Sequence, residues 1–175
     1  MGQYYYSIIL SADGKIVVWM CAHNYQNGLK LMEHSFLTNQ FVSTFEFGLS
    51  PEGGHHKSRV VWAGDYADNE PDQEKNLYQQ CTEYTMILPH IKDTEMYRFI
   101  VNHTKKLFVD KSKVPKNQYG YRLHPLPLLT CEGNGRGGGD YRNNVPLIGS
   151  WARHVISVEV EAPADYEEIV FDLIE

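Results

Sequence analysis

Cysteine is scarce in this chain, and the spacing of its cysteines excludes the common cysteine-based sites. Cys21, Cys81 and Cys131 lie far apart, and no CxxC pair is present to form a zinc site or a redox motif. His55 and His56 are adjacent, but no other histidine or cysteine is spaced to complete the ligands of a tight zinc site. We therefore expect no bound metal. An odd number of separated thiols fits a reducing compartment, so we expect a cytoplasmic protein.

Long hydrophobic runs and an excess of basic residues are also lacking. The longest strongly apolar run covers residues 16–22, far short of the roughly 20 residues that a membrane helix needs. The opening residues MGQYYYS lack the basic and apolar regions of a secretory signal. Sixteen Lys and Arg against 22 Asp and Glu give a net charge of −6, so there is no overall positive field to hold duplex nucleic acid. We expect neither a membrane protein nor a duplex-binding protein.

The residues that are present are typical of one folded domain. Of the 175 residues, 42% are hydrophobic and 13% are aromatic, far from the composition of a disordered chain. The length fits a single domain covering residues 1–175. Runs of aromatic and β-branched residues predict two hairpins and two further strands, at residues 4–10 with 15–21, 97–101 with 106–110, 59–62 and 154–160. Both faces of the first hairpin carry large side chains, so we expect it to be buried on both faces.

One helix is clearly indicated. Apolar residues recur on a single helical face after Thr38, the expected N-cap: Phe41, Val42, Phe45 and Leu49. Residues 77–88 mix helical and strand signals and stay undecided. Residues 114–128 contain three prolines, which favours an edge strand or an extended wall there. We therefore predict an α+β fold, mainly an antiparallel sheet built from hairpins with one or two helices.

The most unusual segment is CEGNGRGGGDYR, residues 131–142, which has five glycines within seven residues. Ordering so many glycines costs backbone entropy, and their amides can form a concave nest for an anion. Arg136 within the run and Arg142 just after it would add charge-assisted hydrogen bonds. A plain connecting loop is the alternative interpretation. The residues of this segment that we predict to bind a ligand are Gly133, Asn134, Gly135, Arg136, Gly137, Gly138, Asp140 and Arg142.

Two known nucleotide motifs are excluded at this segment. Residues 133–138 match GxGxxG, but that motif needs a helix to open at its third glycine, and Gly139, Asn143 and Pro146 forbid one. A P-loop fails because Gly139 and Asp140 stand where lysine and a hydroxyl residue are required. No cofactor is assigned.

Three further segments carry candidate site residues, each with a structural alternative. In VVWAGDYAD, Trp62 could stack on a flat ring and Asp65 could bind beside it, or both could belong to an ordinary strand end. In NGLKLMEHS, His34 could act as a ligand-binding or acid–base group, or be a hydrogen-bonded structural residue. Trp151 and Arg153 could form an aromatic and cationic wall, with core burial of the indole as the alternative.

Several segments resemble a family of small uncharacterised proteins of bacterial phage and prophage-like elements. They are NGLKLMEHSF, VVWAGDYAD, LHPLPLLT, GNGRGGGDYR and GSWARHVISVE, which together extend over most of the chain. The resemblance implies no activity and transfers no catalytic residue. It implies an accessory protein that works inside a bacterial cell.

The sequence therefore favours a cytoplasmic binding protein that holds an anionic, nucleotide-like small molecule in the glycine-rich loop, with Trp62 or Trp151 stacked on its flat part. The phage resemblance would make such a protein a means of sequestering a host defence signal. Two other classes stay open. One is a hydrolase of phosphoester or glycosidic bonds that uses acidic residues and a histidine, namely Glu33, His34, Asp65 and Asp68. The other is an interaction module whose exposed tyrosines contact and block a host protein.

Overall fold

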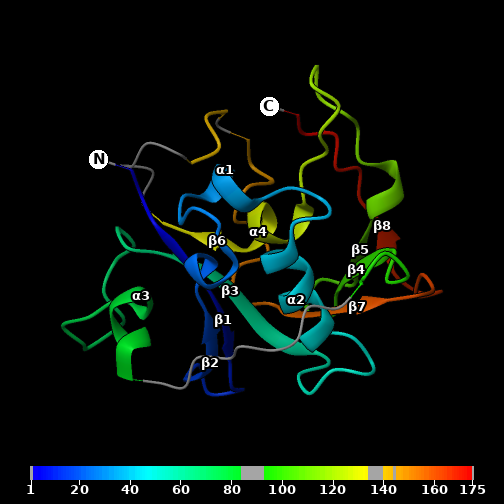
Figure 1. Cartoon of the computed structure of the whole chain (residues 1–175). Helices are drawn as coiled ribbons and strands as arrows, with labels where there is room; N and C mark the ends of the chain where they lie inside the picture. The colour runs from blue at the N-terminus through cyan, green and yellow to red at the C-terminus, as the bar shows by residue number, and fades with distance from the viewer. Residues whose placement is uncertain (1, 84–92, 134–139, 144, 175) are drawn as a thin grey trace.

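A single sheet organises the chain in the computed structural model, which describes residues 2–83, 93–133, 140–143 and 145–174 (Figure 1). Its strands are β1 (Tyr5–Leu10), β2 (Ile16–Met20), β3 (Ser58–Gly64), β4 (Phe99–Asn102), β5 (Leu107–Asp110), β6 (Cys131–Glu132), β7 (Val155–Glu159) and β8 (Glu167–Glu168). The order across the sheet is β2-β1-β3-β7-β4-β5-β8, and β6 pairs with β3 beside this path. The pairs β3–β6 and β5–β8 are parallel, and the other pairs are antiparallel.

The helices are short and lie on the faces of this sheet. The described part of the chain has α1 (Leu31–His34), α2 (Gln40–Gly48), α3 (Leu77–Gln80) and α4 (Pro125–Thr130), with 3₁₀ turns η1 (Ala22–Tyr25), η2 (Cys81–Glu83) and η3 (Lys111–Lys113). In Figure 1, α2 lies across β3 and β7. The fold class is therefore α+β, as predicted. None of the helices in the described ranges is long and apolar enough to cross a membrane.

The first hairpin is confirmed, and β1 is buried on both faces, whereas β2 leaves Val17 exposed. Gly14 adopts a φ of 82° in the tight turn, a conformation that glycine enters without steric cost. Because side chains alternate along a strand, Ile9 joins the main core with α2 and α4, whereas Ile8 and Leu10 join a smaller core on the other face with Leu77 of α3. The two cores place α2 and α3 on opposite faces of the sheet.

The second hairpin, β4–β5, is also confirmed. At its turn the side-chain oxygen of Asn102 accepts hydrogen bonds from the amides of Thr104 and Lys105, each at 3.0 Å. Such asparagine turns reverse the chain within a few residues. On the other side of β4 lies β7, which matches the strand expected at residues 154–160. These strands lie in the right half of the sheet in Figure 1.

The predicted helix forms, but its N-cap is Asn39. The side chain of Asn39 accepts a hydrogen bond from the amide of Val42 at 3.2 Å, and Thr38 lies outside the helix with a φ of 75°. Phe41, Val42 and Phe45 are fully buried, as their spacing predicted.

Helix α4 corrects the interpretation of residues 114–128 as an edge strand or wall. Pro125 occupies the first helical turn, where a missing N–H costs no hydrogen bond and the fixed φ suits the helix. His124 caps this helix, because its Nδ1 accepts the amide hydrogen of Leu126 at 3.1 Å. All six residues of α4 are buried, so no polar face was present in the sequence to signal a helix. Residues 77–83, left undecided from the sequence, form α3 and η2.

Candidate functional site

The glycine-rich segment lies mostly outside the described residues. This applies to Asn134, Gly135, Arg136, Gly137 and Gly138, for which the anion nest stays a prediction. The flanking residues are described. Asp140 accepts hydrogen bonds from Gln3 Nε2 at 2.8 Å and from the hydroxyl of Tyr5 at 2.7 Å. A Cβ at Gly133 would lie 2.2 Å from Gln3 Oε1, so any larger residue there would require the Gln3 side chain to shift. Arg142 is exposed. Asp140 and Gly133 therefore join this segment to the start of β1.

The two predicted stacking residues belong to the core. Trp62 is 0% exposed and Trp151 is 1% exposed, so neither indole presents a face to a ligand. Trp62 Nε1 donates a hydrogen bond to His34 Nε2 at 2.9 Å, and the other ring nitrogen of His34 bonds to the carbonyl of Gly28 at 2.9 Å. Burial lowers the pKa of His34 to about 4, which keeps the ring neutral. All three side chains are therefore core residues in this structure, as their structural alternatives expected.

Asp65 and Arg153 also make structural contacts. One carboxylate oxygen of Asp65 accepts the amide hydrogen of Tyr4 at 2.9 Å, where β3 ends beside β1. The Arg153 guanidinium donates hydrogen bonds to the carboxylates of Glu70 and Glu132 at 2.5 to 3.0 Å, and these two groups raise the pKa of Arg153. An arginine bound by two carboxylates joins parts of the protein to one another. The free cationic wall expected beside Trp151 is therefore not formed.

The residues of the hydrolase interpretation do not form an acid–base pair. Glu33 accepts the amide hydrogen of Lys30 at 3.0 Å at the start of α1, and Asp68 is exposed after β3. His34 is engaged with Trp62 as described above. Among the residues that the structure describes, no three His, Cys, Asp or Glu side chains are grouped so that they could hold a metal ion.

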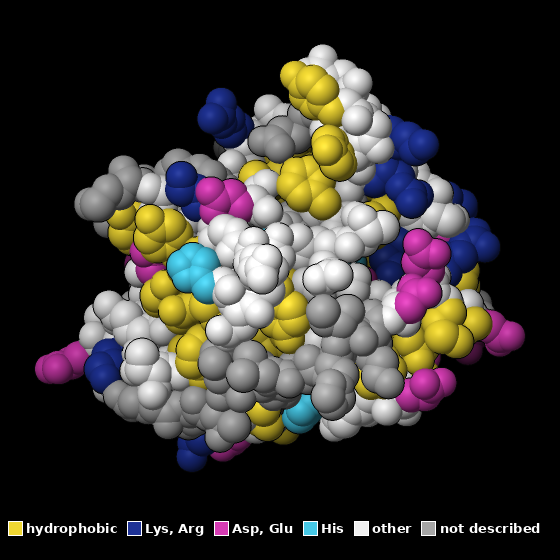
Figure 2. Space-filling view, viewed as in Figure 1, with side chains coloured by type: hydrophobic (Ala, Val, Ile, Leu, Met, Phe, Trp, Pro, Cys, Tyr) yellow, Lys and Arg dark blue, Asp and Glu magenta, His cyan; other side chains and the backbone are white. Residues whose placement is uncertain are grey.

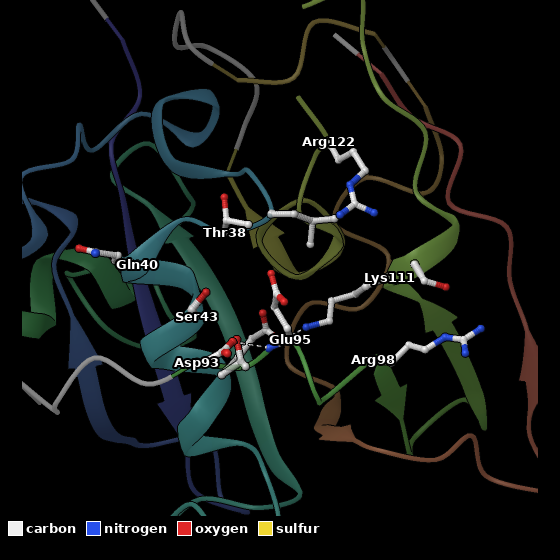
Figure 3. Close-up of a pocket in the computed structure, with 12 residues that line it drawn as sticks. Thr38, Gln40, Ser43, Asp93, Glu95, Arg98, Lys111 and Arg122 are labelled. Atoms are coloured by element: carbon white, nitrogen blue, oxygen red, sulfur yellow. Dashed lines mark hydrogen bonds and ion pairs between the residues drawn. The ribbon is translucent and has the colours of Figure 1, made fainter. Parts of the chain in front are cut away.

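A cleft of about 490 Å³ opens instead between the start of α2, η3 and the segment before β4 (Figure 3). This volume lies within the range of small-molecule sites. It is lined by Leu37, Thr38, Gln40, Ser43, Glu46, Asp93, Thr94, Glu95, Arg98, Lys111, Ser112 and Arg122. None of these residues was predicted as a site residue from the sequence.

Buried charges form the floor of the cleft. Glu46 on α2 is 1% exposed, Lys111 is 8% exposed and His124 is 0% exposed. One oxygen of Glu46 accepts a hydrogen bond from Lys111 Nζ at 2.6 Å, and the other is bound by Nε2 of His124. Because Nδ1 of His124 accepts the amide of Leu126, its Nε2 carries the proton that is donated to Glu46. These contacts satisfy both oxygens of the buried carboxylate.

The electrostatics of this floor hold Glu46 ionised. Burial alone would raise the pKa of Glu46, but His124 and Lys111 outweigh it and the pKa falls below its ordinary value. Burial also lowers the pKa of His124, against the pull of Glu46. The arrangement is therefore a carboxylate with Lys111 as its counter-ion and a neutral imidazole as a second donor.

A second ion pair positions Lys111. Arg98 donates hydrogen bonds to both oxygens of Asp110, at 2.7 and 2.5 Å, and lowers the pKa of Asp110 to about 2. Asp110 in turn accepts the amide of Ser112 at 3.0 Å and caps η3, the turn that begins with Lys111. Figure 3 shows the Arg98 side chain pointing away from the cleft, whereas Lys111 extends into it. Arg98 therefore acts on the cleft through Asp110.

Arg122 is the remaining basic residue of the cleft. Its backbone carbonyl accepts the amide of Leu37 at 2.9 Å, which fixes the segment beside the start of α2. Its side chain is half-buried, and no ion pair joins it to any residue in the described ranges. In Figure 3 Arg122 lies above Lys111, with Thr38 and Ser43 across the cleft. The first turn of a helix also presents amide hydrogens and the positive end of its dipole.

One sequence signal could have pointed to this floor. Glu46 follows Val42 by four residues and therefore falls on the buried face of the predicted helix. A charged residue on an otherwise apolar face requires a buried partner. Its partners Lys111 and His124 are more than 60 residues away, so the sequence alone could not name them.

Comparison with family models, with curated proteins and with solved structures gives no match to this chain. The function must therefore be argued from the chemistry of the cleft.

Proposed function

We propose that the protein binds a small polar molecule in the cleft between α2 and η3, through an anionic group of that molecule. The observation that carries this proposal is the buried Lys111. An ammonium has three N–H donors, and within the described residues Glu46 accepts one of them. The donors that remain, together with the Arg122 guanidinium and the first turn of α2, suit a carboxylate or a phosphate.

The hydrogen bonds around the cleft favour binding over catalysis. Glu46 and His124 are fully buried and bound to each other, so neither can exchange a proton with a ligand. Ser43 lines the cleft, but no base in the described ranges lies within hydrogen-bond distance of its hydroxyl. A serine nucleophile needs such a base. The described residues therefore supply charge and hydrogen bonds without an activated nucleophile.

A second serine has a histidine and a glutamate beside it, but the directions of its hydrogen bonds do not suit catalysis. Ser157 is 0% exposed, and its hydroxyl donates to Glu159 at 2.8 Å. His103 Nε2 lies 2.7 Å from the same hydroxyl oxygen and must donate to it. A catalytic histidine would instead accept the serine proton. This network supports no hydrolase.

The cellular setting belongs to the same proposal. Cys21, Cys81 and Cys131 are all free thiols, which supports a reducing compartment such as the cytoplasm. A binding protein whose described residues supply no catalytic machinery suits the sequestration of a small signal, a role that would fit a phage setting. A nucleotide is not the favoured ligand, because none of the described lining residues has an aromatic side chain that could stack on a base.

Thermal-shift and calorimetric titrations with inorganic phosphate and succinate test the cleft. Arg122→Gln should strongly weaken saturable binding, because it removes the bidentate donor of the site. Arg142→Gln, which removes an exposed arginine beside the glycine-rich segment, is the matched control and should leave binding unchanged. Loss of binding in Arg142→Gln or Arg136→Gln with retention in Arg122→Gln would place the ligand in the glycine-rich segment and refute the cleft proposal.

A second candidate function rests on an exposed tyrosine hairpin. Lys116 pairs with Arg122, and the side chain of Asn117 accepts the amides of Tyr119 and Tyr121 at 3.0 and 2.9 Å. This rigid turn leaves Tyr119 74% exposed and Tyr121 62% exposed. Figure 2 shows hydrophobic side chains projecting at the top of the molecule, with Lys and Arg gathered beside them. Tyrosine and arginine are enriched in protein interfaces, so this hairpin fits an acidic surface of a partner protein.

The interaction surface is tested by cross-linking in cells through a photoreactive residue at Gln118. One acidic protein should be captured repeatedly, should be lost when Tyr119 and Tyr121 are both changed to serine, and should be retained in a Tyr4→Ser control. A captured set that does not change with the tyrosines would refute this candidate.

A further inference from the structure

The charged side chains that line the cleft carry both signs in equal number. They are Arg98, Lys111, Arg122, Glu46, Asp93 and Glu95. Two of the three cations have a carboxylate partner in the protein, since Lys111 binds Glu46 and Arg98 binds Asp110. The lining as a whole is therefore close to neutral, which does not suit a ligand with several charges of one sign.

The charges that remain for a ligand are separated in space. Arg122 lies at the upper end of the cleft in Figure 3, and Asp93 and Glu95 lie at its lower end. Lys111 reaches into the middle of the cleft, between these two ends, and Glu46 accepts one of its hydrogens. Both acidic residues are exposed, and no ion pair joins either of them to a residue in the described ranges. The cleft is thus dipolar, with one positive and one negative end.

We propose that the cleft takes a zwitterion, a small molecule that carries a carboxylate and an ammonium at opposite ends, as amino acids and short peptides do. This inference rests on the proposed function of the cleft as a binding site. The carboxylate would lie against Arg122 and Lys111, and the ammonium against Asp93 and Glu95. A dianion would meet the repulsion of the two acidic residues, and a dication would meet that of the two basic residues.

Three ligands with the same four-carbon skeleton test this directly by calorimetry or by NMR titration. Succinate carries two carboxylates, putrescine carries two ammoniums, and 4-aminobutyrate carries one of each. The zwitterion should bind about fivefold or more tightly than either of the others, because only it pairs both ends of the cleft. Analogues with shorter and longer chains should show one optimal charge separation.

Charge variants distinguish the inference from the function on which it rests. Asp93→Asn combined with Glu95→Gln should weaken 4-aminobutyrate and strengthen succinate, whereas Arg122→Gln should weaken both. The control Asp72→Asn with Glu74→Gln removes the same charge from an exposed loop and should change neither. If succinate binds best to the natural protein and is lost in Arg122→Gln, the zwitterion inference is wrong and the cleft remains a binding site. If no probe binds, both proposals are refuted.

Discussion

The glycine-rich end of the sheet and the cleft both gather charged side chains from distant parts of the chain, but they use them differently. At the glycine-rich end, Arg153 is bound by two carboxylates and Asp140 by Gln3 and Tyr5. In the described structure these groups bind one another, and of their atoms only the acceptor Gln3 Oε1 is left buried without a hydrogen-bond partner among the described residues. They stabilise the junction and leave few donors for a ligand.

The cleft also contains a satisfied network, but that network serves to hold other groups in place. Both oxygens of Glu46 are occupied, and this fixes Lys111 with donors still available. Arg122 has no ion-pair partner within the described ranges. The comparison shows that clustered charges do not by themselves mark a binding site. Donors that the protein leaves unused are the better sign.

Removal of Glu46 should have the largest effect on stability. Glu46→Gln would leave the Lys111 ammonium buried without its counter-ion, so we expect a loss of about 3–5 kcal/mol in the free energy of unfolding. Urea denaturation measures this loss. The matched change at the other cluster, Glu132→Gln, removes one of two carboxylates from the half-exposed Arg153 and should cost at most about 1 kcal/mol. Similar losses in the two variants would show that the clusters do not differ.

The core histidine His34 gives the next largest effect. Its folded-state pKa of about 4 lies below the unfolded value of about 6.5, so the unfolded chain binds a proton first as the pH falls. The stabilisation is complete above about pH 6.5 and is lost between pH 6.5 and pH 4, with a total of about 3 kcal/mol. Denaturation at several pH values should show a flatter profile in His34→Gln. NMR should find the His34 ring neutral at pH 5.5, and a ring charged at that pH would refute the assignment.

Loss of the Arg153 side chain should have a smaller effect on stability. Arg153→Gln breaks the contacts to Glu70 and Glu132, and because the side chain is 35% exposed we expect a loss of only about 1 kcal/mol. Binding of 4-aminobutyrate in the cleft should be unchanged. A loss of binding without a loss of folding would show that Arg153 takes part in ligand recognition after all.

Local patterns predicted the hairpins and α2 because the forces that form them are local. Runs of aromatic and β-branched residues indicate β1 and β2, and the spacing of Phe41, Val42 and Phe45 indicates α2. Helix α4 was missed because its six residues are all buried and therefore carry no periodic polar face. In a segment whose residues are all buried, the hydrophobic pattern cannot distinguish a helix from an extended chain.

The cleft could not be predicted for a different reason. Its floor joins Glu46, Lys111 and His124, which no motif spacing connects, and its positive end depends on Arg122 pairing with the segment before α2. The sequence instead indicated Trp62 and Trp151, because a large indole ring suits ligand stacking as well as core packing. Composition marks residue types that bind ligands, but only tertiary contacts decide which of them keep unused donors.

Substitution of Thr38, which lines the cleft, should have the smallest effect on stability. Predicted as an N-cap, it instead adopts a φ of 75°, which crowds a β-branched side chain. Thr38→Gly should remove about 1–2 kcal/mol of backbone strain from the folded state. Part of this gain is lost because glycine gives the unfolded chain more entropy, so the free energy of unfolding should rise by about 0.5 kcal/mol, as measured by thermal unfolding. Thr38→Val keeps the branched shape and should gain nothing. If Thr38→Gly is instead destabilised, the hydroxyl of Thr38 makes a contact that holds this end of the cleft. Zwitterion binding would then weaken in both Thr38→Gly and Thr38→Val.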